Sequence, residues 1–346
     1  MRKKNQSVLL AALLAVAVPG TAVAQRANFE RTFDVAAGTL DVSSSQGAVD
    51  VRAGTGSRIV VKGSVAVRIG WDVPANAAAL VRAVADHPPV TQDGQIVRVQ
   101  PPTDADERRA VTISYVIEVP TPTAVRLATQ SGAASVSGVA GAVELTTQSG
   151  ATNISDVTGA VNVTTQSAAL TLRNIGGTVT ALSQSGAVAV DGTRGALSVT
   201  TQSSAFTGHG IGGALRVRTQ SGEVNAAMVG PGAVDVETGS SRIRIQRLGG
   251  AVRARSNSGR IILDGRPGGE WDLSTGSGAI EIGMDSSSRF RLDAATGSGS
   301  VTLRGAHVQT GGVVEKKAIR GDVGSNGPVI RANSRSGSVT VDVARQ

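Results

Sequence analysis

A tetrapeptide recurs in this chain at a fixed step of 18 residues. The first copy is Thr129-Gln130-Ser131-Gly132, and further copies, some with one replacement, start at Thr147, Thr165, Ser183, Thr201 and Thr219. A repeat of constant length predicts stacked units, because one unit of this size buries its apolar face only against its neighbours. The repeat therefore restricts the chain to a solenoid or a related stacked architecture.

Apolar residues inside each repeat alternate with polar ones. Two columns precede the tetrapeptide, starting at Val125 and Leu127, and two follow it, starting at Ala134 and Val136. A fifth, isolated column holds Val139, Val157, Ile175, Thr193, Ile211 and Val229. Alternation of period two predicts short strands with one buried face, and 18 residues at about 3.3 Å each make one lap of a narrow coil. We predict an all-β fold, a parallel β-helix (β-solenoid) with rungs of about 18 residues and parallel pairing between successive laps.

Both ends of the chain depart from the exact repeat. We divide the sequence into residues 1–24, a signal peptide; residues 25–124, an N-terminal cap and first rungs with a helical insert; and residues 125–346, the regular β-solenoid. The insert covers about residues 71–109 and contains a predicted helix over residues 76–86, with Asn76 as its cap and Leu80, Ala83 and Val84 as its apolar stripe. An irregular loop is expected around residues 307–317. Residues 339–343 are expected to form the last strand, with Arg335 and Arg345 protecting its edge.

The first residues have the pattern of a secretory signal. Arg2, Lys3 and Lys4 precede an apolar run over residues 8–18, and Ala22-Val23-Ala24 follows. A basic start, a short apolar core and a small-x-small end predict cleavage after Ala24 and export to the periplasm or the extracellular space. The mature chain is expected to contain no transmembrane segment, and the absence of cysteine excludes disulfides and a lipoprotein anchor.

Composition argues against one class of partner. The formal net charge is +8, and three of these charges lie in the signal region. Only 2% of the residues are aromatic, so stacking platforms for bases are scarce. The excess charge is mild and dispersed, and we therefore expect no binding of nucleic acid.

The repeated tetrapeptide allows two interpretations. Its hydroxyls and amides would form a regular array able to bind a polysaccharide or ice. Alternatively it is a corner, where glycine relieves strain, hydroxyls satisfy backbone groups, and glutamines on adjacent rungs hydrogen-bond along the axis. The column before the ladder threonine includes Ala128, Leu182 and Arg218, which interrupt any flat polar plane. We therefore favour the corner.

Charged residues form columns that alternate in sign from rung to rung. One column contains Arg126, Glu144, Arg216, Asp235, Arg253 and Asp272, and a second contains Arg218, Glu237 and Arg255. Opposite charges on neighbouring strands predict ion-pair ladders on a solvated face. The alternative is an anion-binding stripe. Its tentative binding surface consists of Arg216, Arg218, Arg242, Arg244, Arg253 and Arg255.

Catalytic signatures are weak. His87, His209 and His307 are scattered, no spacing of His, Asp and Glu suits a metal, and no Gly-x-Ser-x-Gly elbow occurs. We predict no catalytic residue, no cofactor and no metal site. The alternative is a polysaccharide lyase or hydrolase, in which Asp264 and Asp285 would join Asp272 in a cleft.

The recurring Ser-Gly-small-(Val/Ile)-x-(Val/Ile/Leu) rung, with the opening Phe33-x-Val35 and Leu40-x-Val42, resembles an exported bacterial family. Its members are candidate adhesins of unknown function, related to the domain with a head GIN motif. The resemblance extends over nearly all of the mature chain, about residues 33–343. It implies a right-handed parallel β-helix, an envelope or extracellular location and no established catalysis.

We therefore expect a non-enzymatic exported envelope or surface protein that acts in adhesion or scaffolding through a rigid solenoid face. The expected partners are cell-envelope polysaccharide or envelope proteins. The polysaccharide-cleaving enzyme is kept as the alternative, and a third hypothesis is a purely architectural rod.

Overall fold

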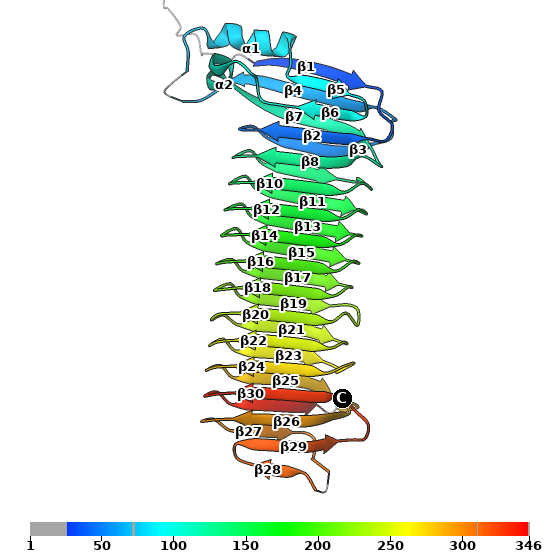
Figure 1. The fold of residues 1–346 in the computed structure, drawn as a ribbon, viewed down its shortest axis with the longest axis vertical. Coiled ribbons are helices and arrows are strands. Elements are labelled where there is room, and N and C mark those ends of the chain that lie inside the picture. The colour runs from blue at the N-terminus through cyan, green and yellow to red at the C-terminus, as the bar shows by residue number, and fades with distance from the viewer. Residues whose placement is uncertain (1–25, 71–72, 310, 345–346) are drawn as a thin grey trace, which may run out of the picture.

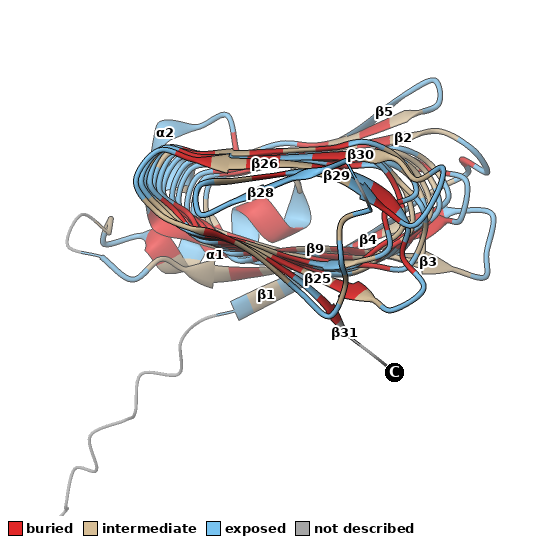
Figure 2. Cartoon of the chain, turned by 90° about the horizontal axis from the view of Figure 1, so that it is seen from below, coloured by how far each residue is buried: buried red, intermediate tan, exposed pale blue. Residues whose placement is uncertain are grey.

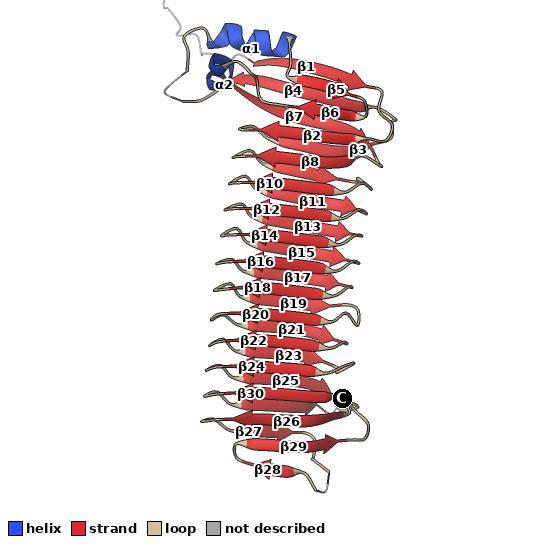
Figure 3. Cartoon of the chain, viewed as in Figure 1, coloured by secondary structure: helices blue, strands red, loops and turns tan. Residues whose placement is uncertain are grey.

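The computed structural model describes residues 26–70, 73–309 and 311–344. They form a long stack of strands with two helices at its N-terminal end (Figure 1, Figure 3). The predicted β-solenoid is confirmed, because two large sheets of mostly parallel strands run along the whole stack. The predicted signal peptide, residues 1–24, lies outside the described residues.

One sheet of the described region has 16 strands, in the spatial order β28-β29-β26-β30-β24-β22-β20-β18-β16-β14-β12-β10-β8-β2-β6-β5. In chain order they are β2 (Thr39–Ser44), β5 (Val90–Asp93), β6 (Ile96–Val99), β8 (Ala124–Thr129), β10 (Val143–Thr147), β12 (Val161–Thr165), β14 (Val179–Ser183), β16 (Leu197–Thr201), β18 (Leu215–Thr219), β20 (Val234–Thr238), β22 (Val252–Ser256), β24 (Trp271–Thr275), β26 (Phe290–Thr296), β28 (Val313–Glu315), β29 (Ala318–Val323) and β30 (Val329–Ser334).

The other sheet has 15 described strands, in the order β1-β4-β7-β3-β9-β11-β13-β15-β17-β19-β21-β23-β25-β31-β27. They are β1 (Arg26–Phe33), β3 (Val49–Gly54), β4 (Ile59–Val67), β7 (Val111–Pro120), β9 (Ala134–Ser137), β11 (Thr152–Val157), β13 (Leu170–Ile175), β15 (Val188–Thr193), β17 (Phe206–Ile211), β19 (Val224–Met228), β21 (Ile243–Leu248), β23 (Ile261–Gly265), β25 (Ile280–Asp285), β27 (Val301–Arg304) and β31 (Val339–Ala344).

The 18-residue step of the sequence is the pairing register of the structure. On β10, Val143 lies beside Val125 of β8 on one side and Val161 of β12 on the other. The apolar columns point into the space between the two sheets, and Figure 2 shows these sheets as two facing layers seen along the stack. Leu145 and Leu172, from the two layers, are fully buried. One narrow core therefore runs through the stack.

The tetrapeptide forms the corner between the two sheets, as predicted. Its first residue is buried, and in every copy except the one at Thr147 its hydroxyl accepts a hydrogen bond from the backbone N–H three residues later. The distances are 3.0 Å for Thr165 and Ala168 and 2.9 Å for Thr219 and Gly222. Neighbouring corners stack so closely that a Cβ on Gly150 would lie 1.8 Å from the carbonyl oxygen of Gly132. Neighbouring corners bond along the axis through the backbone, as when Gln148 N–H donates to the carbonyl of Thr129 at 3.3 Å. Among the described residues, no side-chain hydrogen bond joins neighbouring glutamines of the ladder, so that part of the prediction is wrong.

The second corner explains an error in the predicted fifth column. In several rungs this corner has one residue in the left-handed region, such as Asp156 (φ 56°) or Asn174 (φ 51°), followed by a buried apolar residue. The rung of β19 is one residue shorter here, because its pairing with β17 shifts register after Gly208. Met228 consequently occupies the buried position beside Ile211, and Val229, predicted to be inward, is 63% exposed.

Two helices and antiparallel strands close the N-terminal end (Figure 1). Helix α1 (Ala77–Asp86) matches the predicted helix, but Asn76 makes no side-chain cap and Ala83 is exposed. The helix instead buries Ala77, Val81, Val84 and Ala85. A second helix, α2 (Ala105–Ala110), was not predicted, and its signal was Asp104, whose carboxylate accepts hydrogen bonds from two backbone N–H groups of its first turn.

The C-terminal end departs most from the prediction. Residues 339–343 were expected to form the terminal edge, but β31 lies between β25 and β27. Likewise β30 lies between β24 and β26, so the last rung of the sequence is inserted into the stack (Figure 1). The irregular segment folds into the antiparallel pair β28 and β29 beyond it. Edge protection by Arg335 and Arg345 is therefore unnecessary for β31, because neighbouring strands already cover both of its edges.

Candidate binding face

The outward side chains of β18, β20, β22 and β24 make the most charged part of the 16-stranded sheet. In each of these four strands, two side chains point to solvent and alternate with three that point inward. The residue two positions before the first outward one, at the preceding corner, also points to solvent. Four of the six predicted arginines lie here, on alternate strands: Arg216, Arg218, Arg253 and Arg255. We call this area the charged face.

Carboxylates on the intervening strands pair with these arginines. Asp235 lies 3.4 Å from Arg216 and 3.7 Å from Arg218, and Arg218 also contacts Glu237. Asp272 lies 3.7 Å from Arg253 and 3.1 Å from Arg255. The predicted ion-pair ladder is thus present, with added diagonal contacts, and the arginines share their charge with acids on neighbouring strands.

A shallow groove with a volume of about 600 Å³ runs along one border of the charged face. Its floor consists of small exposed residues at the corner before each strand, Ala196, Ala214, Ala233 and Ala251. The wall is the next outward column, which contains Thr180 and Ser198 and then the charged Arg216, Asp235, Arg253 and Asp272. On the rungs of Arg216, Asp235 and Arg253, a methyl group stands beside a longer charged side chain, and this alternation creates the groove. This alanine column was visible in the sequence but was not recognised as a functional signal.

A second hollow, of about 630 Å³, borders the opposite side of the charged face. It lies where the strands end and the tetrapeptide corners begin, and its lining includes Arg218, Glu237 and Arg255 together with Thr200 and Asn257. The charged columns therefore form a ridge between two hollows that both follow the long axis of the stack.

The other two arginines of the tentative surface lie elsewhere. Arg244 is on β21 and Arg242 immediately precedes that strand, so both belong to the 15-stranded sheet. Arg242 pairs with Glu223 at 3.4 Å. The six arginines thus lie on opposite faces of the solenoid, because consecutive strands of one rung belong to different sheets. Whether any of them binds a ligand stays a prediction.

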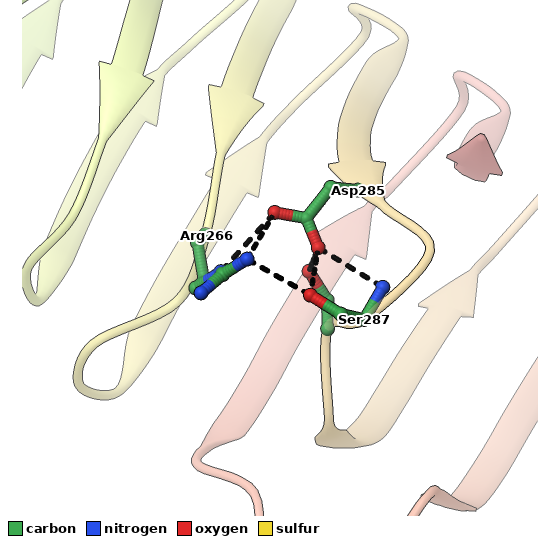
Figure 4. A network of polar contacts seen from close by, with 4 residues as sticks. Arg266, Asp285 and Ser287 are labelled. Atoms are coloured by element: carbon green, nitrogen blue, oxygen red, sulfur yellow. Dashed lines mark hydrogen bonds and ion pairs between the residues drawn. The ribbon is translucent and has the colours of Figure 1, made fainter. Parts of the chain in front are cut away.

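The carboxylates of the alternative enzyme hypothesis are also divided. Asp264 and Asp285 lie on β23 and β25 of the 15-stranded sheet, whereas Asp272 is on β24 of the other sheet. Asp285 accepts hydrogen bonds from Arg266 Nη2 at 2.9 Å and from the Ser287 hydroxyl at 2.6 Å, and Figure 4 shows the three side chains together. Hydrogen bonds from Ser287 and Arg266 lower the pKa of Asp285, which favours its ionised form. The structure does not form the proposed three-carboxylate cleft.

Two kinds of feature are absent from the described residues. No group of three or more His, Cys, Asp and Glu side chains among them is placed to hold a metal ion. Within the same residues, the helices are too short or too polar to cross a membrane.

Comparisons with known proteins give one family match and two distant structures. A structure from Clostridium sporogenes, named a candidate cell adhesion protein, is 8% identical with a TM-score of 0.18 and aligns over 92% of this chain and 100% of its own. A candidate adhesin from Bacteroides fragilis is 14% identical with a TM-score of 0.22, over 92% and 97%. No curated protein matches the chain. Residues 177–342 match the model of the Toastrack family, DUF4097.

The Toastrack match begins near β14 and ends within β31, so it includes the charged face and the inserted C-terminal rung. The expected resemblance to a family of unknown function is supported over residues 177–342, which match the Toastrack model.

Proposed function

We propose that the chain is a non-enzymatic exported surface protein that acts in adhesion, using the charged face to bind an extended envelope polysaccharide. The observation that carries this proposal is the groove of Ala196, Ala214, Ala233 and Ala251, which runs along the axis beside a ladder of paired charges. Rungs repeat about every 4.8 Å, and a linear polymer that lies along the groove meets equivalent groups at each step.

The chemistry of the face suits a polymer with hydroxyl and few acidic groups. Arginine offers several planar N–H donors, and Asp235 and Asp272 offer acceptors within the same ladder. The alanine methyls provide an apolar floor for the faces of sugar rings. Because the acids balance most of the arginine charge, a densely anionic polymer would gain little attraction from this face.

Rigidity adds to the argument. The backbone of each groove strand is fixed by hydrogen bonds to the rungs on both sides, such as Leu197 N–H to the carbonyl of Ala214 at 2.8 Å. Ion pairs hold the long side chains in place between rungs. A preorganised face loses less conformational entropy on binding than a flexible one. Export of the protein rests on the predicted signal at residues 1–24.

A glycan array probed with the mature protein tests the proposal, followed by titration of any glycan that binds. Ala214→Gln and Ala233→Gln would fill the groove, and we expect each to weaken binding by about tenfold or more, equivalent to about 1.4 kcal/mol. Arg126→Gln, outside the groove, is the matched control. The proposal fails if the array shows no binding, or if the groove variants bind as well as the control.

The polysaccharide-cleaving alternative is tested in the same preparation. Incubation with uronate-containing polymers should leave them intact, since the three carboxylates do not share a cleft. Turnover that disappears in Asp264→Asn or Asp272→Asn would replace adhesion with catalysis.

A further inference from the structure

The N-terminal cap contains a pocket that is separate from the charged face. Its volume is about 480 Å³, and it lies between the corner at residues 43–46, the start of β7, and helix α2 with the preceding Pro101 and Pro102. Pockets of roughly 300–1,000 Å³ are the usual size for small-molecule sites. Its lining is more polar than that of the groove on the charged face.

The pocket exists because one corner lacks a stacking neighbour of its own kind. Along the regular stack, each tetrapeptide corner lies against the next. The corner after β2 is covered on one side in the same way, where Gln130 N–H donates to the carbonyl of Ser44 at 3.2 Å. The other side of this corner faces the pocket, and Pro101, Pro102 and α2 stand across the pocket in the place of another corner. Because Pro101, Pro102 and α2 fill the place of a corner incompletely, a gap remains between the two sheets.

Three arginines line the pocket, and the described lining includes no carboxylate. Arg108 donates through Nη1 to the carbonyl of Pro102 at 2.9 Å and also contacts the carbonyl of Thr103, while Arg109 pairs with Asp106. Arg68 is half-buried, and its guanidinium contacts no carboxylate of a described residue. Arg68 and Arg108 therefore retain donors for an anion in the pocket.

Tyr115 supplies an independent observation. Its side chain is 3% exposed, lines the pocket and makes no hydrogen bond with any described residue. Phe29 contacts the ring edge-on, with the centroids 6.3 Å apart. The hydroxyl is not among the fully buried polar atoms without a partner, so it is open to the pocket, and a molecule in the pocket can bond to it. Burial raises the pKa of Tyr115, so the hydroxyl stays protonated at neutral pH and can donate.

We propose that this pocket binds a small organic anion, a sugar-sized molecule that carries a carboxylate or a phosphate. Arg68 and Arg108 hold the anionic group, because guanidinium groups bind both oxyanions through paired N–H donors. The Tyr115 hydroxyl donates to an oxygen deeper in the pocket. This site is distinct from the polysaccharide groove and does not depend on the adhesion proposal.

The chain has a single tyrosine, which makes the test direct. Protein labelled with ¹³C only at the Cζ of tyrosine gives one signal, from the carbon that carries the hydroxyl, so a shift of that signal reports on Tyr115 alone. The probes are D-glucuronate for the carboxylate, glucose 6-phosphate for the phosphate and D-glucose as the neutral control. We expect at least one anion to shift the signal saturably, with a Kd below about 1 mM, and glucose to leave it in place.

Variants assign the groups. Arg68→Gln should weaken binding of the active anion about tenfold or more, because it removes a charged donor from the pocket. Tyr115→Phe preserves the ring contact with Phe29, and calorimetry should show binding weakened by about fivefold. Arg126→Gln, on the outer face of β8, should bind as the wild type does. The larger response to glucuronate or to glucose 6-phosphate decides between carboxylate and phosphate.

Three results would overturn the proposal. They are the absence of a saturable shift with both anions, an equal response to glucose, and unchanged affinity in folded Arg68→Gln. Binding to a glycan array through the charged face would be unaffected by any of them, so the two proposals fail separately.

Discussion

The regular stack and the C-terminal end use the same rung but assemble it differently. From β10 to β23, each strand pairs with the strand one rung earlier and one rung later in the chain. At the C-terminal end, Trp271 of β24 pairs with Ile330 of β30, and the intervening segment forms β26 to β29 farther out. Pairing in the regular stack therefore joins segments that are close in sequence. At the C-terminal end, the chain first forms β26 to β29 and then returns to place β30 beside β24. Longer closures cost more entropy and form later, so we expect the C-terminal end to fold after the regular stack.

Removal of residues 329–346 should have the largest effect, because it should destabilise the C-terminal end and leave the regular stack intact. In the intact chain, β30 lies between β24 and β26, and β31 lies between β25 and β27. Without β30 and β31, no strand pairing of the described residues joins β26 and β27 to the regular stack. We expect amide exchange in β26 to β29 to accelerate by ~100-fold or more, while β10 to β18 keep their protection, since repeat proteins couple mainly to nearest neighbours. Hydrogen exchange followed by mass spectrometry measures both regions. Equal loss of protection in both would show one cooperative unit.

Trp271→Ala tests the junction between the two regions. Trp271 is fully buried, and its Nε1 donates to the carbonyl of Gly250 at 3.0 Å. Loss of the ring leaves a cavity and an unpaired carbonyl, and we expect about 3–5 kcal/mol of destabilisation in urea unfolding. Leu197→Ala, equally buried within the regular stack, is the control at about 2–5 kcal/mol. Amide exchange in β26 to β29 is then compared between the variants. If exchange there is no faster in Trp271→Ala than in Leu197→Ala, the Trp271 side chain does not hold the C-terminal end in place.

The sequence predicted the stack because each rung repeats one pattern of inward and outward positions. The period located the buried columns from Val125 onward and assigned the tetrapeptide to a corner. The same uniformity concealed the inserted rung, because Ser336-Gly337-Ser338-Val339 has the same pattern as every other rung and does not specify its neighbours. Position in a solenoid depends on chain connection as well as on pattern.

The candidate face was predictable in part for a related reason. Alternating charges identified the ladder of Arg216, Asp235 and Arg253 on one sheet. Arg242 and Arg244 were grouped with it because neighbouring columns in one rung look alike, although the corner sends them to the other sheet. The cap pocket had no sequence signal, since Arg68 and Tyr115 are brought together by antiparallel pairing of β4 and β7.

The shortened rung of β19 allows a matched test within the regular stack. Met228 is fully buried, whereas its neighbour Val229 is 63% exposed. We expect Met228→Ala to cost about 2–5 kcal/mol and Val229→Ala less than about 0.5 kcal/mol in chemical unfolding. Similar costs for both variants would mean that the 18-residue column continues through Val229 after all.

Tyr115 tests the N-terminal end through pH. Its pKa is raised in the folded protein by burial, so the neutral phenol is favoured there and the anion in the unfolded chain. This stabilisation is fully present below the unfolded pKa of about 10, and above it stability should fall by about 1.4 kcal/mol per pH unit until the native phenol ionises. Absorbance at high pH, compared with Tyr115→Phe, follows the single phenol. Native titration near its ordinary pKa would contradict the burial.

The smallest expected effect concerns the charged face, and it separates stability from function. Arg253 lies 3.7 Å from Asp272, and both side chains are at least one-third exposed. Solvent and salt screen such a pair, and Arg255 also contacts Asp272, so Arg253→Gln should change unfolding by less than about 1 kcal/mol. High salt should reduce even that difference. A larger cost would mean that the ladder holds rungs together, which would favour a structural role for the charges. A small cost accompanied by weaker glycan binding would favour their role in adhesion.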